Sequence, residues 1–382
     1  MKRPIRVLLL CDRLDIAGGV ERFVCALAND LVREGMEVAV GSVSTRRASV
    51  RYPLDSGVRV LTGVEGRLFS DTGEATSRIG RAWGLLRTQW RIGRALSRLT
   101  RSYQPDVVLL NGLTTACSVL ALDRGFAART ICCDHNHFSA RSGLWQRLRR
   151  WLYPKVGAVV SLTETDAPRF RTLNPRTHVI YNAASLRADT PALPGNAVVL
   201  AVGRHVAQKG FDLLLRAWVL VAARVPLVRL RIVGDGPLRG EHERLAQSLG
   251  VAGRVEWLGP TADIERHYRE AAVFVLSSRY EGMPIALLEA QSLGVPAVAF
   301  DCPTGPGEIL TPQTGRLVPP GDVNALAAAI IDLLLSPALR AQMGHAAIAR
   351  SRELFSPQQH ERRWAALVRE VALANAYGVA SA

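Results

Sequence analysis

Short apolar segments alternate with amphipathic stretches along almost the whole chain, and this alternation most constrains the fold. In the first half the apolar segments are IRVLLL, VAVGSV, DVVLL, RTICC and GAVVSL, and in the second half AVVLAVG, VRLRIVG, RVEWLG, AVFVLS and PAVAF. Strands that alternate with helices form parallel sheets with helices on both faces. The pattern therefore predicts an α/β fold.

The chain is long enough for two domains. Its 382 residues exceed what one hydrophobic core ordinarily organises. The alternation pauses at residues 183–196, AASLRADTPALPGN, a composition typical of an interdomain linker. We therefore expect Rossmann-like domains at 1–182 and 197–355. The end of the chain is expected to be helical from Asp322 to about Ala374 with breaks at Pro337 and Pro357, and residues 356–382 to pack back on the N-terminal domain.

The formal net charge of +15 favours polyanionic partners such as nucleic acid, anionic lipid or phosphorylated substrates. No helix-turn-helix, zinc-finger or RNA-recognition signature is present, so no nucleic-acid partner is expected. No apolar stretch approaches the ~20 residues of a membrane span, and the N-terminal MKRPIRVLLLCDRLD is interpreted as a buried strand rather than a signal peptide. The six cysteines lack metal-ligand spacing, which indicates buried, reduced thiols in the cytoplasm.

Ligands of open parallel sheets bind at the carboxyl ends of the strands, so residues directly after the strands are the candidates. Gly18 and Gly19 follow the first strand, where they make either a phosphate-binding helix start or a plain tight turn. Arg204 and Lys209 follow AVVLAV, where two cations either clamp a diphosphate or remain solvated.

The segment GDGPLR, which begins at Gly234, follows a third strand. It lacks the dinucleotide fingerprint because Arg239 stands where that motif requires glycine, and this disfavours a nicotinamide-dependent dehydrogenase. The sequence contains no GxxxxGK[ST] loop, which disfavours a P-loop enzyme, and no Asp-x-Asp pair for a metal-bound diphosphate.

Two glutamates stand eight apart in RYEGMPIALLEA, at Glu281 and Glu289. A carboxylate inside an apolar run costs stability unless it is paired. With Pro284 in the first turn of a helix, both acids can face a cleft and accept hydrogen bonds from sugar or ribose hydroxyls, while the amides of Gly282 and Met283 can meet a phosphate. The alternatives are a helix-dipole contact for Glu281 and a surface acid for Glu289, although the apolar flanks disfavour free exposure of Glu289.

In the first half, the strand RTICC ends in Asp134, His135, Asn136 and His137. These residues are too few for a metal site, and we expect one histidine to face the cleft while the other packs elsewhere. Asn111, which follows DVVLL, is a further polar candidate.

Two segments combine arginines with aromatic residues at helical spacing. They are RAWGLLRTQWRIGRALSRLTR and ARSGLWQRLRRWLYPKV. Such helices either lie on anionic lipid or pack their apolar faces on the sheet with the arginines solvated. Together with the net charge they favour an acceptor at a membrane surface.

Four motifs, GGVERxxxxLA, GRxxxxKG, GDGPLR and EGMPxxLLEA, occur in this order. In them the chain resembles the family 4 retaining glycosyltransferases of GT-B fold over nearly its whole length. AFDCPTGPGEIL resembles the branch that builds bacterial surface polysaccharides and lipid-linked oligosaccharides. The resemblance implies two Rossmann-like domains facing across a cleft. It also implies transfer of a hexose-type sugar from a nucleoside-diphosphate sugar, with UDP rather than GDP, to a lipid-linked saccharide or polysaccharide.

The resemblance also assigns roles to residues. It implies that Glu281 contacts the donor sugar and Glu289 the ribose. Arg204 and Lys209 would clamp the diphosphate, and His135 would lie near the reacting sugar. Asn182 matches a family asparagine, although Ala183 replaces the glycine that normally follows. The implied catalytic residues are His135, Glu281, Arg204 and Lys209; the donor-binding residues are Gly18, Gly19, Arg204, Lys209, Gly234, Gly282, Met283 and Glu289; the acceptor-side candidates are Asn111, Asn136 and His137.

The implied chemistry is a front-face transfer with retention, in which the leaving diphosphate helps to accept the acceptor's proton. No metal or other cofactor is required, and the enzyme is expected in the cytoplasm, at the inner face of the membrane. Two alternatives keep the fold, a nucleotide-sugar epimerase and a transferase for a small soluble acceptor. A third, a non-catalytic scaffold or nucleic-acid binder, is disfavoured by the intact charged motifs.

Overall fold

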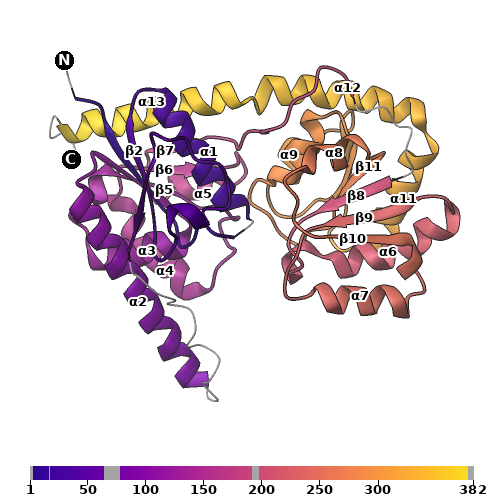
Figure 1. Ribbon diagram of the computed structural model, residues 1–382, viewed down its shortest axis with the longest axis horizontal. Helices are drawn as coiled ribbons and strands as arrows, with labels where there is room; N and C mark the ends of the chain where they lie inside the picture. Colours follow the sequence, from indigo (N-terminus) through magenta and orange to yellow (C-terminus); the bar gives the residue numbers. More distant parts are fainter. Residues whose placement is uncertain (1–2, 17, 64–77, 192–197, 377–382) are drawn as a thin grey trace. The chain divides into compact units, whose positions relative to one another are not determined.

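The structure is a computed structural model that describes residues 3–16, 18–63, 78–191 and 198–376 (Figure 1). The chain divides into two compact units. Unit 1 comprises residues 1–180 and 361–382, and unit 2 comprises residues 181–360. Unit 1 is therefore discontinuous in the sequence. Of the segment expected as a linker, residues 192–196 lie outside the described residues.

Unit 1 contains a seven-stranded parallel sheet in the order β3-β2-β1-β4-β5-β6-β7. The central β1 is buried along most of its length because its neighbours cover both edges and helices cover both faces. In register, Leu8 of β1 lies between Ala39 of β2 and Val108 of β4. The strands are β1 Arg6–Leu10, β2 Glu37–Ser42, β3 Arg59–Thr62, β4 Val107–Asn111, β5 Thr130–Cys133, β6 Ala158–Ser161 and β7 Thr177–Val179.

Among the described residues, five α-helices lie between these strands, and the end of α13 completes unit 1. The helices are α1 Gly19–Arg33, α2 Arg78–Tyr103, α3 Leu113–Leu122, α4 Gly143–Leu152, α5 Ala167–Arg171 and α13 Pro357–Ala376. Helix α3 packs against both α2 and α4. The final helix joins the core through Trp364, which is fully buried with its ring 5.6 Å from that of Phe23 on α1.

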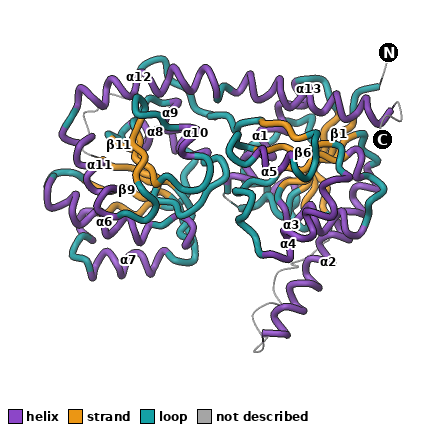
Figure 2. The backbone as a smooth tube through the Cα atoms, turned by 180° about the vertical axis from the view of Figure 1, so that it is seen from behind, coloured by secondary structure: helices purple, strands orange, loops and turns teal. Residues whose placement is uncertain are grey.

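Unit 2 contains a six-stranded parallel sheet in the order β10-β9-β8-β11-β12-β13. Figure 2 shows its strands between helices α8 and α9 on one side and α6 and α7 on the other. Trp218 of α6 and Ile330 of α11 are fully buried in one hydrophobic core on this sheet. The strands are β8 Val198–Val202, β9 Arg229–Val233, β10 Val255–Leu258, β11 Val273–Leu276, β12 Ala297–Phe300 and β13 Gly315–Val318. The helices are α6 Phe211–Arg224, α7 Arg239–Ser248, α8 Ile264–Arg269, α9 Ile285–Ser292, α10 Pro306–Ile309, α11 Val323–Leu335 and α12 Pro337–Leu354.

All ten expected strands form, each within one residue of its apolar segment. The structure adds β3, β7 and β13, each at the edge of its sheet. The expected helix breaks at Pro337 and Pro357 are confirmed, since α12 and α13 begin at these prolines. The α/β fold with two parallel sheets is therefore confirmed.

All six cysteines are buried and free, as expected. Among the described helices, no single one is long and apolar enough to cross a membrane. Helix α11 and the segment Pro337–Ala376 satisfy that criterion only jointly, with a bend of 100° between them.

Candidate active site

The carboxyl end of the unit 2 sheet gathers most of the candidate residues. Strands β8 and β11 are neighbours, so the loop after β8 with Arg204 and Lys209 lies beside the loop after β11 with Glu281. Gln208 Nε2 donates to the Tyr280 carbonyl oxygen over 3.0 Å and joins the two loops.

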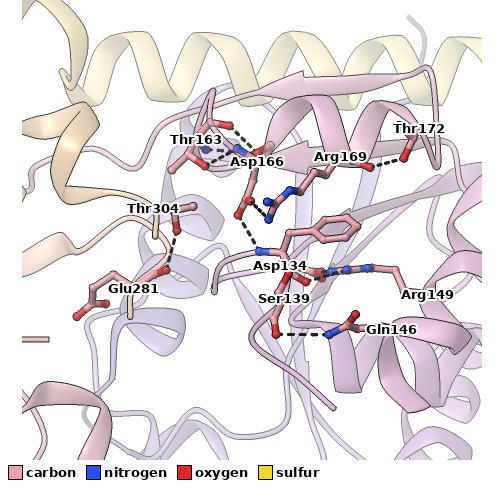
Figure 3. A network of polar contacts seen from close by, with 12 residues as sticks. Asp134, Ser139, Gln146, Arg149, Thr163, Asp166, Arg169, Thr172, Glu281 and Thr304 are labelled. Carbon is pink, nitrogen blue, oxygen red and sulfur yellow. Dashed lines mark hydrogen bonds and ion pairs between the residues drawn. The ribbon is translucent and has the colours of Figure 1, made fainter. Parts of the chain in front are cut away.

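Lys209 and Glu281 form an ion pair that explains the first buried acid. Lys209 Nζ lies 2.6 Å from Glu281 Oε1, and Ser278 Oγ donates to the same oxygen over 2.6 Å. Thr304 Oγ1, after β12, donates to the Glu281 carbonyl oxygen over 2.8 Å (Figure 3). Glu281 is 5% exposed. A cation and two hydroxyl groups therefore hold this buried segment in one conformation.

Two glycines allow the loops to approach so closely. Gly210 adopts φ +62°, and a Cβ there would overlap the Ser277 carbonyl oxygen of the β11 loop. Gly234, with φ +146°, lies directly against the Gly203 carbonyl oxygen. The GDGPLR turn after β9 is thus packed on the loop that carries Arg204. Arg204 itself is exposed, and its guanidinium makes no hydrogen bond or ion pair within the described parts of the chain.

Glu289 is 2% exposed on α9, so the expectation that it is not freely exposed is confirmed. Ser185 Oγ donates to its Oε1 over 2.9 Å, and the Tyr268 hydroxyl donates to its Oε2 over 3.1 Å. Both carboxylate oxygens therefore accept hydrogen bonds from the protein. Pro284 is the N-cap of α9 and lies just before its first turn.

Gly282 and Met283, the two residues before Pro284, are buried. The Met283 carbonyl oxygen accepts a 2.9 Å hydrogen bond from Asn182 Nδ2. Asn182, at the beginning of unit 2, therefore anchors the backbone just before α9, which lies about 100 positions later in the sequence.

In unit 1, the structure brings His135 and Asn111 together at the carboxyl ends of β5 and β4. His135 Nε2 lies 3.0 Å from Asn111 Oδ1, and Asn111 Nδ2 donates to the Leu10 carbonyl oxygen over 3.2 Å. The Phe23 ring lies against His135 at a centroid distance of 4.7 Å. Burial lowers the pKa of His135 to about 4. The imidazole is therefore neutral at neutral pH, and its Nε2 donates to the amide oxygen.

The loop that follows His135 is fixed by a buried ion pair (Figure 3). Arg149 Nη1 of α4 lies 3.1 Å from Asp134 Oδ2, and the Tyr153 hydroxyl donates to Asp134 Oδ1 over 2.6 Å. Arg149 also donates to the Phe138 carbonyl oxygen over 2.7 Å. Burial raises the pKa of Asp134. The alternative in which the arginines of this segment are solvated does not hold for Arg149, because its guanidinium is buried and paired with Asp134.

Asn136 and His137 lie in this same loop and are partly exposed. Burial lowers the pKa of His137. The Phe138 amide, which follows, donates to Asp166 Oδ2 over 2.7 Å and anchors the loop to the start of α5.

Gly18 is the N-cap of α1 and Gly19 its first residue, so the glycine pair stands at a helix start as predicted. The Glu21 carboxylate folds back over Gly18, where a Cβ would meet it. Sequence reasoning missed Asp12, between β1 and this helix. It accepts a 2.7 Å hydrogen bond from Thr115 Oγ1, and burial raises its pKa. Asp12 lies directly after the buried strand β1, and this position is the sequence signal that could have identified it as a candidate.

The basic segments divide between core and surface. Trp145 and Leu148 of α4 pack against the core of unit 1, whereas Leu144 and Trp151 are 54% and 51% exposed. The described parts of the chain contain no cluster of three or more His, Cys, Asp or Glu side chains able to hold a metal ion.

Comparisons with known proteins match the chain to glycosyltransferase family models and to individual glycosyltransferases. A family model described as Glycosyltransferase Family 4 matches residues 17–187, and one described as Glycosyl transferases group 1 matches residues 196–336. The chain is 27% identical to the amylovoran biosynthesis glycosyltransferase AmsD of Erwinia amylovora over 373 residues, covering 94% of this chain and 98% of AmsD.

A second relative is a GDP-mannose-dependent monoacylated alpha-(1-6)-phosphatidylinositol monomannoside mannosyltransferase of Corynebacterium glutamicum. It is 30% identical over 288 residues, which cover 66% of this chain and 73% of the relative. Among solved structures, Anabaena Alr3699/HepE in complex with UDP and glucose superposes with a TM-score of 0.73 at 20% identity, over 96% of this chain and 99% of that one.

Proposed function

Because this chain belongs to glycosyltransferase family 4 and has the GT-B fold, we propose that it moves a hexose-type sugar from a UDP-sugar to a lipid-linked saccharide or polysaccharide acceptor, with retention at the anomeric carbon. Its relatives include glycosyltransferases of amylovoran biosynthesis and of lipopolysaccharide core biosynthesis, which supports this class of acceptor. In this proposal, unit 2 binds the donor and unit 1 supplies the acceptor-side residues.

One observation carries the donor assignment. The exposed guanidinium of Arg204, which has no hydrogen-bond or ion-pair partner among the described residues, and the Lys209–Glu281 pair lie at adjacent strand ends of unit 2. An exposed cation beside a buried acid suits a diphosphate attached to a sugar, because the guanidinium binds phosphate oxygens and the carboxylate accepts hydrogen bonds from sugar hydroxyls.

The proposed mechanism needs positioning and charge more than a base. Arg204 and Lys209 stabilise the charge that develops on the departing diphosphate, and Glu281 holds the donor sugar. Glu289 exchanges one of its protein hydroxyl partners for a ribose hydroxyl. The neutral His135 acts as a hydrogen-bond donor or acceptor at the reacting sugar, since its lowered pKa keeps it uncharged.

Ligand-induced stabilisation tests the donor site. The melting temperature is measured with UDP, GDP, ADP, CDP and NAD at matched concentrations, since a ligand of the folded state stabilises it by RT ln(1 + [L]/Kd). GDP is included because one relative is GDP-mannose-dependent. We expect a shift with UDP that Arg204→Ala abolishes. A shift with GDP alone would replace UDP in the proposal, and no shift with any of them would overturn the donor site.

The transfer assay tests the catalytic assignment. Glu281→Ala and Arg204→Ala should each lower the transfer rate roughly a hundredfold while leaving the fold intact, because each removes one charge from the proposed diphosphate and sugar contacts. Near-normal turnover in both variants would contradict the assignment.

We also propose that the acceptor is reached at an anionic membrane surface through unit 1. Trp90, Leu122, Leu144 and Trp151 are 41–54% exposed on the adjacent helices α2, α3 and α4. The Arg124 guanidinium carbon lies 3.6 Å from the Trp151 ring centroid, and Arg94 lies over Trp90 at 5.1 Å. Exposed rings flanked by arginines suit an interface of acyl chains and anionic headgroups.

Vesicle sedimentation distinguishes membrane binding through this surface from non-specific adsorption of exposed apolar side chains. The chain should bind vesicles that contain phosphatidylglycerol and bind neutral phosphatidylcholine vesicles less. Leu144→Ser with Trp151→Ser should weaken the binding, whereas Leu227→Ser, at a 90% exposed leucine of unit 2, should not. Equal binding by both variants would overturn the membrane assignment.

A further inference from the structure

A pair of buried histidines lies behind the loop that carries Arg204. Nδ1 of His205 and Nδ1 of His242 are 2.9 Å apart, and the two residues are only 1% and 4% exposed. The rings of Phe211 and Trp257 lie against His205 with centroid distances of 5.0 and 5.7 Å. Side chains from α6, α7 and β10 therefore enclose the His205 ring.

The backbone of His205 joins two loops at the carboxyl end of the sheet. Its N–H donates to the Asp235 carbonyl oxygen over 2.9 Å, and its carbonyl oxygen accepts from the Leu238 N–H over 3.0 Å. His205 thus ties the loop after β8 to the GDGPLR turn after β9. Because Arg204 directly precedes it, the anchored ring of His205 fixes the backbone from which the Arg204 guanidinium extends.

The hydrogen bond of the histidine pair requires that one of the two Nδ1 atoms carries no proton. A hydrogen bond between two Nδ1 atoms requires one to donate and the other to accept, so the two share a single proton. Burial lowers the pKa of His205 to about 4 and also lowers that of His242, which keeps both neutral at neutral pH. A proton taken up by either imidazole places a positive charge at a site that is only 1% to 4% exposed, and a proton on both Nδ1 atoms replaces the bond by repulsion.

The charged groups around the pair are largely paired with one another. Arg239 forms an ion pair with Glu243, and Asp212 forms one with Arg279. The groups whose charges act on the two histidines are Arg239, Asp235 and Glu243 at His205, and Asp212, Glu241 and Arg279 at His242. Each histidine therefore faces two acids and one arginine, and burial is the largest influence on both imidazoles.

We propose that the neutral His205–His242 pair positions Arg204 for binding the donor diphosphate, and that protonation of the pair releases the Arg204 loop. The inference rests on the proposed function, which assigns Arg204 to the diphosphate. Release returns the buried imidazole toward its ordinary pKa of 6.5. Each pH unit below that value therefore favours release by about tenfold, until the pH nears the lower pKa of the anchored pair.

Two substitutions at His242 separate positioning from bulk packing. His242→Leu removes the Nδ1 partner. His242→Asn keeps a hydrogen-bonding atom near the position of Nδ1 but does not titrate. UDP affinity is measured by calorimetry at pH 7.5 and 5.0, with GDP in parallel, together with KM and kcat for the donor. His345→Leu, at an exposed histidine of the same unit, is the matched control.

At pH 7.5 we expect His242→Leu to weaken UDP binding about tenfold, the effect of losing a buried hydrogen bond, and to raise KM more than it lowers kcat. His242→Asn and His345→Leu should bind within about twofold of the unsubstituted chain. Between pH 7.5 and 5.0 the unsubstituted chain should lose at least about threefold more affinity than His242→Asn, in which the titration of UDP itself is the same.

The outcomes separate this inference from the function on which it rests. If neither UDP nor GDP binds the unsubstituted chain, both proposals are overturned. If UDP binds and His242→Asn shows the same loss of affinity at pH 5.0 as the unsubstituted chain, only the positioning role is overturned. The pH comparison decides the question even if His242→Leu fails to fold.

Discussion

The Lys209–Glu281 pair makes an asymmetric prediction about stability. Glu281 is the more buried partner, with a side chain that is 7% exposed against 19% for Lys209, and the two charged atoms are 2.6 Å apart. Removing one partner of a fully buried pair costs ~3–5 kcal/mol, whereas an exposed pair contributes ~0–1 kcal/mol. Lys209→Met leaves a buried carboxylate that keeps the Ser278 hydroxyl but loses its cation, so we expect it to cost about 2–3 kcal/mol.

The complementary substitution should cost less. Glu281→Gln keeps the shape and hydrogen bonds of the side chain, and the remaining ammonium of Lys209 can reach water, so about 1 kcal/mol is expected. In the double variant no buried charge is left. Its stability should therefore return to within about 1 kcal/mol of the unsubstituted chain, well above that of Lys209→Met alone.

Scanning calorimetry measures these differences. For a unit of this size, 1 kcal/mol corresponds to a shift of about 2–4 °C, so Lys209→Met should lower the transition of unit 2 by about 4–12 °C. That transition is identified as the one that Trp218→Phe also lowers, since Trp218 is fully buried in the core of unit 2. If the double variant loses the sum of the two single effects, or Glu281→Gln costs as much as Lys209→Met, the reasoning from burial is refuted.

Three further predictions concern both units. Arg149→Met should destabilise unit 1 by about 3 kcal/mol, because it leaves the buried carboxylate of Asp134 without its cation. Adding Asp134→Asn should restore part of the lost melting temperature, and a calorimetric comparison of the single and double variants that shows no recovery would contradict this. His135 has a pKa of about 4 in the folded chain against its ordinary 6.5, so its contribution to stability is complete above pH 6.5 and is lost as the pH falls toward 4. Between pH 7 and pH 5 the melting temperature should therefore fall less steeply in His135→Gln than in the unsubstituted chain. Equal slopes would count against the burial of this imidazole. Gly234→Ala should destabilise unit 2 by at least about 2 kcal/mol in urea unfolding, because its Cβ would overlap the Gly203 carbonyl oxygen, and an unchanged midpoint would refute that overlap.

The sequence predicted the interior of both sheets and one edge strand, β10, but not the other three edge strands. Strands such as β1 and β4 are buried on both faces and read as continuous apolar runs. The missed strands β3, β7 and β13 lie at edges and mix polar with apolar residues. An edge strand forms because its neighbour offers a free row of hydrogen-bonding groups. The sequence of the edge strand itself does not show that such a neighbour is present.

The candidate site was predictable in its charged residues but not in their partners. Lys209 and Glu281 are 72 positions apart, and only the adjacency of β8 and β11 brings them together. Asp134 and Arg149 show the same limit in unit 1. The arginine lies in a segment with several others, and its burial depends on which face of α4 meets the sheet. Glu289 was expected to be sheltered, yet its partner Tyr268 had no signal in the local sequence.

The discontinuity of unit 1 has a consequence for its synthesis on the ribosome. Its core is completed by α13, whose fully buried Trp364 contacts Phe23 and whose Arg369 forms an ion pair with Glu34 at 2.6 Å. These residues are translated after residues 181–360 of unit 2, which form one continuous segment. Unit 2 can therefore finish folding on the nascent chain while unit 1 still lacks its last helix. A premature stop codon shortly before residue 357 would remove the whole of α13. It would therefore impair unit 1, most of which is translated first, more than unit 2, which would lose only its last few residues.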